Sequence, residues 1–303
     1  MSKKQESKFV YKNEACMKKM HDFYDRTLAA LGIQYSEDYF DTSFGKTHCL
    51  IVGDASKPRL CTIHGGNGIT TLNLKLFLPL LSEYSIIAPD VIAMPGKSEP
   101  YRNISSKKDE FGFWIKEVLD FYKVEKISFV VSSYSASMFL SFVKHFPKMV
   151  DRSLLLVPSG IAHGPIFPMI TQMIVPFTKY YFNPSEKTLD SIIQTMAGES
   201  DATWREFFDL MMSSYKMELR SPKEYNEKDL ASFNAPLLII ASQNDIFFPA
   251  DRVFKRAKEI FKSPVTTVEI DSKHLPSPDK MVDVCERTLK FLKDLSNAKI
   301  TNL

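Results

Sequence analysis

Glycine is scarce in this sequence, which has 11 glycines among 303 residues, whereas average usage near 7% gives about twice that number. Long apolar runs are also missing, since no stretch approaches the roughly 18 uninterrupted apolar residues of a membrane-spanning helix. Charge of one sign is not in excess, because 39 Lys plus Arg stand against 36 Asp plus Glu. We therefore expect no membrane span, no disordered or collagen-like chain and no nucleic-acid partner.

Cysteine is sparse and dispersed, and no two of the four residues form a CxxC pair; they are Cys16, Cys49, Cys61 and Cys285. A zinc site needs clustered Cys and His ligands, so this spacing argues against one. The first eight residues include three lysines, but no apolar stretch follows them, which predicts that there is no secretory signal. These features are typical of a cytoplasmic protein with free thiols.

Apolar side chains are plentiful, with 44% hydrophobic residues that include 23 Phe. For a chain of this length, folding buries about three quarters of the surface, enough for one large core with a modest subdomain. Apolar residues at helical spacing over 12–31, ended by Gly32, predict an amphipathic helix. Two further segments, 35–44 and 47–52, flank Gly45 and predict a β-hairpin.

Beyond the hairpin, short apolar runs alternate with helical segments; the runs are 60–63, 85–88, 127–131, 153–157, 237–240 and 265–270. Nearly continuous apolar runs are typical of strands that are covered on both faces. Strands that alternate with helices predict an α/β fold with a parallel sheet.

One interval, 160–233, breaks this alternation. It contains no strand-like run but many Met, Phe and Tyr residues, and a structureless loop of this length is improbable in a compact domain. We therefore predict a helical cap inserted at 160–233. Residues 1–159 would then hold the N-terminal helix and the first part of the core, and residues 234–303 the remainder of the core.

Chemically suggestive residues follow four of the predicted strands, where parallel sheets bind their ligands. The first segment is His64-Gly65-Gly66-Asn67-Gly68. Three glycines within four positions allow backbone N–H groups to approach a developing negative charge, as an oxyanion hole requires. A simple tight turn is the alternative interpretation, and His64 is expected to hold the loop by hydrogen bonds.

The second segment is Ser133-Tyr134-Ser135-Ala136-Ser137, at a junction between a predicted strand and a helix. A nucleophile elbow places its serine in a strained turn with small residues two positions before and after, usually glycines. Ser135, between Ser133 and Ser137, fits this pattern. Helix capping by serines is the alternative.

The third and fourth segments contribute an acid and a histidine. Asp245 follows the run 237–240, where it can orient an imidazole or simply cap a turn. His274 follows the last predicted strand, and among the six histidines it is the one placed after both a strand and an acid.

In this order, the glycine loop, serine elbow, acid and histidine resemble the α/β-hydrolase family, and within it the carboxylesterase-like members with a helical cap. The resemblance covers roughly residues 36–295. It implies an α/β-hydrolase fold, in which a mostly parallel central sheet carries helices on both faces and the cap is inserted.

The resemblance also implies a mechanism and a site. Ser135 would attack an ester, His274 would accept its proton, and Asp245 would orient the imidazole. The implied oxyanion hole consists of Gly66, Asn67 and Ala136, and the implied substrate contacts are Tyr134, Phe167, Met173 and Phe247. A small-molecule ester is the expected substrate, and no metal or organic cofactor is required.

The sequence departs from the family at several glycines. Ser133 and Ser137 take the places of both elbow glycines, and Ser242 takes that of the glycine after the acid-bearing strand. Three alternatives therefore stay open: an aminopeptidase of the proline-iminopeptidase kind, a hydrolase of C–C bonds or lactones, and a non-catalytic ligand-binding protein with this fold.

Overall fold

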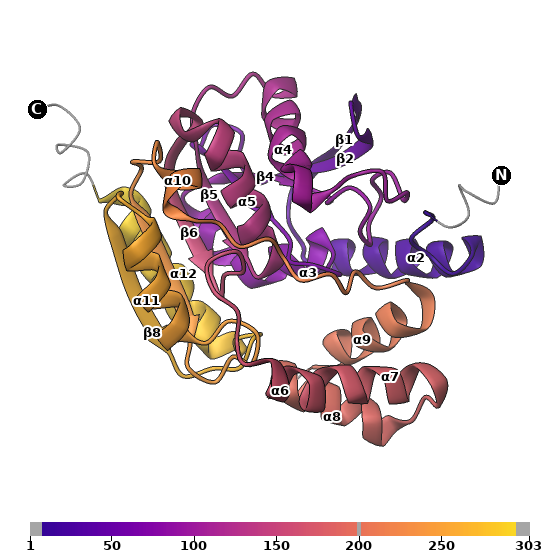
Figure 1. The fold of residues 1–303 in the computed structure, drawn as a ribbon. Helices are drawn as coiled ribbons and strands as arrows, with labels where there is room; N and C mark the ends of the chain where they lie inside the picture. The colour runs from indigo at the N-terminus through magenta and orange to yellow at the C-terminus, as the bar shows by residue number, and fades with distance from the viewer. Residues whose placement is uncertain (1–7, 199–200, 295–303) are drawn as a thin grey trace, which may run out of the picture.

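An eight-stranded sheet forms the centre of the protein (Figure 1) in a computed structural model that describes residues 8–198 and 201–294. The spatial order of the strands is β1-β2-β4-β3-β5-β6-β7-β8. Strands β3 to β8 run parallel, whereas β2 is antiparallel to both of its neighbours. The strands are β1 Tyr35–Thr42, β2 Gly45–Val52, β3 Arg59–Ile63, β4 Ser85–Pro89, β5 Ile127–Ser132, β6 Val150–Leu156, β7 Leu237–Ser242 and β8 Val265–Ile270.

The apolar runs of the sequence account for this sheet. All six predicted runs coincide with strands, and every residue of β4, β5 and β7 is buried. The edge strand β1, by contrast, is largely exposed. The predicted hairpin is also present as β1 and β2. Residues 1–7 and 295–303 lie outside the described residues. The first range holds most of the segment in which a secretory signal was sought, and the second begins with residue 295, where the resemblance to the α/β-hydrolase family ends.

Helices cover both faces of the sheet (Figure 1). On one face α3 (Thr70–Phe77) packs against α12 (Pro278–Lys293). In a second group each helix contacts the next; the group consists of α4 (Glu110–Phe121), α5 (Tyr134–His145), α10 (Glu227–Leu230) and α11 (Ala250–Ile260). The predicted mostly parallel sheet between two helical layers is therefore confirmed.

Helix α2 (Glu14–Ala30) precedes the sheet and begins at Asn13, whose side chain accepts a hydrogen bond from Cys16 N–H. Just before it, residues 8–12 pair with two segments that are distant in sequence. Val10 N–H donates to Pro100 O on one side, and Lys12 N–H donates to Ser214 O on the other. This extended piece therefore joins the sheet region to the end of a later helix.

A group of helices comes between β6 and β7: α6 (Ile166–Met169), a π-helical turn (Ile170–Ile174), α7 (Val175–Phe182), α8 (Glu186–Met196) and α9 (Ala202–Ser214). In Figure 1 these helices lie together on one side of the sheet, with α9 beside α2. Residues 216–226, here called the return segment, then run back across the molecule to α10 (Figure 1). No helix in the two described ranges has both the length and the apolar content that crossing a bilayer requires.

Candidate active site

Ser133 occupies the sharp turn between β5 and α5. Its backbone lies at φ 56° and ψ −127°, and a positive φ is uncommon for a residue with a side chain. Its N–H donates to Leu156 O at 3.0 Å, and its carbonyl accepts from Ser159 N–H at 3.1 Å and Ser159 Oγ at 2.9 Å. A strained turn from strand to helix that presents a serine hydroxyl is the geometry of a nucleophile elbow.

Ser135, the predicted nucleophile, lies inside α5 and is fully buried, with 0% of its surface exposed. Its Oγ lies 2.8 Å from both Ile63 O and Ser132 O, and it accepts from Ser132 N–H at 3.0 Å. The hydroxyl therefore fastens α5 to the ends of β3 and β5. The expectation that Ser135 is the serine beside the histidine is wrong, because that position belongs to Ser133.

His274 joins Ser133 to an acid. Its Nε2 lies 2.8 Å from Ser133 Oγ, and its Nδ1 lies 2.8 Å from Asp245 Oδ2. Because a carboxylate accepts hydrogen bonds, Nδ1 carries the proton and Nε2 is left to accept from the serine hydroxyl. His274 and Asp245 are both buried, whereas Ser133 is partly exposed. Hydroxyl, imidazole and carboxylate in this order can transfer a proton from Ser133 to His274.

Two loops at the carboxyl ends of neighbouring strands bring Asp245 and His274 together. Asp245 Oδ1 accepts a hydrogen bond from Phe247 N–H at 2.8 Å, which closes the first loop. Ser242 Oγ then bridges to the second loop, because it donates to Ser272 O and accepts from Ser272 N–H at 3.3 Å. The serine that replaces the expected glycine thus fixes the acid-bearing loop against the histidine-bearing loop.

The glycine loop after β3 is held by His64, as the sequence predicted. The imidazole is buried; its Nδ1 lies 2.8 Å from Gly65 O, and its Nε2 lies 2.9 Å from Val91 N. A carbonyl accepts and an amide donates, so the ring is neutral and protonated at Nδ1.

The three residues predicted for the oxyanion hole differ in what their N–H groups contact. Ala136 N–H donates to Ser133 O at 3.0 Å, and Asn67 N–H is directed at Met94 Sδ at 3.4 Å. Gly66 N–H has no acceptor among the described residues. The N–H of Tyr134, which sequence reasoning did not select as a donor, is likewise unpaired within that part of the chain, because the first residue of a helix has no intrahelical acceptor.

The glycine loop lies very close to the elbow. A Cβ added to Gly66 would lie 2.8 Å from Tyr134 Cβ, so only glycine lets the two backbones approach in this way. Counted from Ser133, the elbow positions usually filled by glycine hold Val131 and Ser135. The elbow therefore contains no glycine, and the close approach depends on the facing loop.

The four predicted substrate contacts are separated in space. Phe247 packs against the imidazole of His274, with the two ring centroids 4.9 Å apart, and Tyr134 follows Ser133 directly. Phe167 is 75% exposed on α6, whereas Met173 is only 3% exposed and packs within the inserted helices. Two of the four residues are therefore adjacent to the Ser133–His274 pair.

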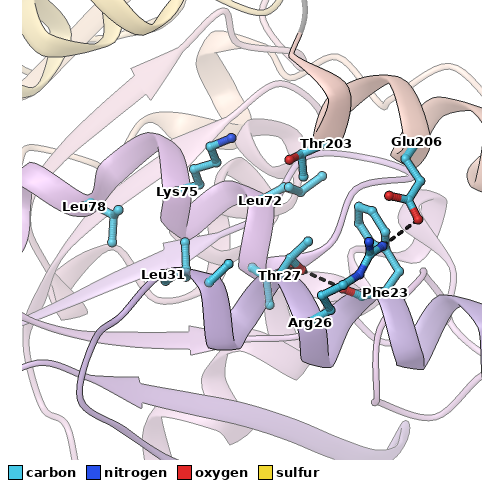
Figure 2. Close-up of a pocket in the computed structure, with 11 residues that line it drawn as sticks. Phe23, Arg26, Thr27, Leu31, Leu72, Lys75, Leu78, Thr203 and Glu206 are labelled. Carbon is cyan, nitrogen blue, oxygen red and sulfur yellow. Dashed lines mark hydrogen bonds and ion pairs between the residues drawn. The ribbon is translucent and has the colours of Figure 1, made fainter.

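A cavity of about 420 Å³ lies between α2, α3 and α9 (Figure 2). Two ion pairs connect α2 and α3 to the start of α9 around this cavity: Arg26 pairs with Glu206 and Lys75 pairs with Asp201, each at 2.5 Å. None of the lining residues belongs to the loops that carry Ser133, Asp245 or His274, so the cavity is separate from the candidate active site. The remaining lining residues are Phe23, Thr27, Ala30, Leu31, Thr71, Leu72, Leu78 and Thr203.

Burial lowers the pKa of His64 below its usual value near 6.5, although the charge of Asp90 and the hydrogen bond to Gly65 oppose the shift. At a pH between the lowered pKa and 6.5, His64 therefore binds a proton in the unfolded chain but not in the native protein. We expect the free energy of unfolding to fall as the pH drops from about 6.5 toward the lowered pKa, by at most about 1.4 kcal/mol per pH unit. Denaturant unfolding at several pH values measures this slope, and a His64→Gln variant that kept the same slope would contradict the assignment.

No family model matches the chain. Carboxylesterase YbfK of Bacillus subtilis is 23% identical over 284 residues, which cover 90% of this chain and 93% of that protein. The crystal structure of YbfK superposes with a TM-score of 0.76 at 21% identity, over 92% of this chain and 99% of the other. The crystal structure of the naproxen esterase of Bacillus subtilis superposes with a TM-score of 0.76 at 18% identity, over 90% of this chain and 97% of that chain.

A dienoate hydrolase (2-hydroxy-6-oxo-6-phenylhexa-2,4-dienoate hydrolase) from a Rhodococcus strain is a more distant structural neighbour. Its TM-score is 0.63 at 17% identity, over 85% of this chain and 99% of that one. The chain therefore has the α/β-hydrolase fold. Within that fold it is carboxylesterase-like, and the similarity extends over nearly its whole length.

Proposed function

We propose that this protein is a serine hydrolase that cleaves carboxylic esters, with Ser133 as the nucleophile, His274 as the general base and Asp245 as the residue that orients the imidazole. The observation that carries the proposal is the continuous hydrogen-bonded series from Ser133 Oγ through His274 to Asp245 at the carboxyl edge of the sheet. Similarity to carboxylesterases supports an ester as the substrate class.

In the first half of the reaction, Ser133 Oγ attacks the acyl carbon while its proton passes to His274 Nε2. The carbonyl π bond opens, and the negative charge collects on the carbonyl oxygen. The N–H groups of Gly66 and Tyr134 are the proposed donors to this oxygen, because both lie at the elbow without an acceptor in the described structure. The C–O bond of the ester then breaks, and the alcohol leaves with the proton from His274.

In the second half, water replaces the alcohol. His274 removes a proton from the water, the resulting hydroxide attacks the acyl-enzyme, and Ser133 recovers its proton as the carboxylate leaves. Asp245 remains ionised throughout and stabilises the imidazolium that forms twice per cycle. Hydrolysis thus consumes one ester and one water and yields one alcohol and one carboxylic acid.

The proposed role of residues 160–233 is that of a cap which supplies the apolar surface for the ester. Its Met and aromatic side chains suit a tolerant apolar site. Phe247 and Tyr134, which are adjacent to the catalytic pair, are the proposed substrate contacts from the core. An ester of moderate size with apolar groups is accordingly the proposed substrate.

A fluorophosphonate probe tests the proposal directly, because it phosphonylates only an activated serine. We expect one adduct, at Ser133, and turnover of p-nitrophenyl esters in an acyl-length series from acetate to octanoate. Peptide mapping locates the adduct, and Ser133→Ala supplies the blank. A protein that takes up no probe at Ser133 and hydrolyses none of these esters is not the proposed enzyme. Turnover of a proline p-nitroanilide but no ester would instead indicate an aminopeptidase.

A further inference from the structure

Asn67 adopts a backbone conformation that is uncommon for residues other than glycine. It lies at φ 55°, in the left-handed region where asparagine is tolerated better than most other residues that carry a Cβ. Its neighbour is Gly66, whose N–H is a proposed oxyanion donor. The direction of that N–H depends on the loop conformation on both sides, so whatever fixes Asn67 also fixes the donor.

The side chain of Asn67 contacts a segment far away in sequence. Nδ2 donates to Glu218 O at 3.1 Å, and Oδ1 accepts from Glu218 N–H at 2.7 Å. The amide thus satisfies both backbone groups of one residue, as a neighbouring strand would. Of the standard side chains of this length, only an amide provides a donor and an acceptor together in this geometry.

The return segment that contains Glu218 is itself fastened on both sides of this contact. Before it, Lys216 N–H donates to Val10 O at 2.7 Å. After it, Ser137 Oγ donates to Lys223 O at 2.9 Å. Glu218 is therefore a fixed point on the chain that leaves the inserted helices, and Asn67 connects the oxyanion loop to that point.

We propose that Asn67 is a positioning residue: its side chain, rather than its N–H, serves the oxyanion hole by holding Gly66 in place against the return segment. The inference rests on the proposed function, since it needs Gly66 to bind an oxyanion. The proposal also implies that the side-chain amide of Asn67 couples the position of the inserted helices to the orientation of the Gly66 N–H group.

Asn67→Gly tests this inference, because glycine keeps the left-handed backbone without strain and removes both hydrogen bonds to Glu218. We expect kcat for p-nitrophenyl butyrate to fall about 10- to 100-fold, less than the loss of a donor itself costs, while KM stays within about threefold. The affinity for a trifluoromethyl ketone, whose adduct with Ser133 carries an oxyanion, should fall in parallel. The affinity for the product butyrate should not.

The matched control is Lys123→Gly, an exposed residue at φ 53° outside the catalytic loops. It introduces the same backbone freedom, and we expect kcat to remain at the wild-type value. An Asn67→Gly enzyme with wild-type kcat and ketone affinity would overturn the inference. So would a parallel loss of kcat, butyrate affinity and thermal stability, since that pattern indicates a structural role alone.

The wild-type protein separates this inference from the proposed function. If the wild type hydrolyses no ester and takes no fluorophosphonate at Ser133, the proposed function fails and the inference falls with it. If the wild type is active and Asn67→Gly is indistinguishable from it, the inference alone fails.

Discussion

Replacing Ser133 by alanine is expected to lower kcat for ester hydrolysis by about 10⁴- to 10⁶-fold, because no other hydroxyl contacts His274 among the described residues. The thermal midpoint should change little, since Ser133 is partly exposed and the imidazole is the one hydrogen-bond partner of its Oγ in the described part of the chain. Steady-state kinetics with p-nitrophenyl butyrate and a thermal melt of the same preparation measure the two effects. Residual kcat within about tenfold of wild type would exclude Ser133 as the nucleophile.

Ser135→Ala is the matched control, and its expected result is the reverse. The variant loses a buried hydroxyl and leaves Ser132 N–H without its acceptor, which costs about 1–3 kcal/mol of unfolding free energy. Activity should persist, because the hydroxyl contacts neither His274 nor the exposed side of the elbow. If Ser135→Ala abolished turnover in a fully folded protein while Ser133→Ala did not, Ser135 would be the nucleophile, as the sequence pattern predicts.

Replacing Asp245 by asparagine is expected to lower kcat by about 10⁴-fold. Asparagine has nearly the same shape, but its amide can present an N–H to His274 Nδ1. That contact favours the tautomer with the proton on Nε2, which can no longer accept from Ser133. The measurement is kcat for p-nitrophenyl butyrate as a function of pH, together with circular dichroism as a check on folding.

Asp271→Asn serves as the control for this substitution. Asp271 is exposed on the loop before His274, and its Oδ1 accepts from Asn244 Nδ2 at 2.9 Å. It thus carries the same charge at the same edge of the sheet without touching the imidazole. We expect its kcat to lie within about threefold of wild type, and equal losses in both variants would show that general electrostatics, rather than the Asp245 contact, governs the rate.

The fold could be predicted from the sequence because its signals are local. Each buried strand is a short apolar run, and each run is separated from the next by a helical pattern. The proximity of Asp245 and His274 could also be predicted from the sequence, since each residue follows its strand by only a few positions. Parallel strands place such residues at one edge without further information.

The serine that contacts His274 lies two residues before the one that the sequence pattern selects, for an identifiable reason. Serines occupy positions 132, 133, 135 and 137, and the small-x-Ser-x-small pattern selects the central one. Distance from the strand was the better signal: the apolar run ends at Val131, and the elbow follows a strand at once. Ser135 is already the second residue of α5, and its hydroxyl is buried.

The glycine loop after β3 illustrates what sequence alone does not contain. The side chain of Asn67 forms hydrogen bonds with Glu218, which lies 151 positions away in sequence. No local sequence pattern predicts this contact. Ala136 N–H, chosen because it follows Ser135, donates to Ser133 O, whereas the N–H that follows Ser133 is that of Tyr134. The two-residue shift from Ser135 to Ser133 therefore changes the proposed oxyanion donor as well as the proposed nucleophile.

The extended piece at residues 8–12 has a consequence for how the chain is made. Val10 and Lys12 pair with residues 214–216, which leave the ribosome some two hundred residues later. During synthesis, residues 8–12 therefore lack these partners until most of the protein has been made. Their pairing with residues 214–216 closes one of the longest loops in the molecule. The amide protons of residues 8–12 should accordingly be among the last to gain protection in a pulse-labelled refolding experiment.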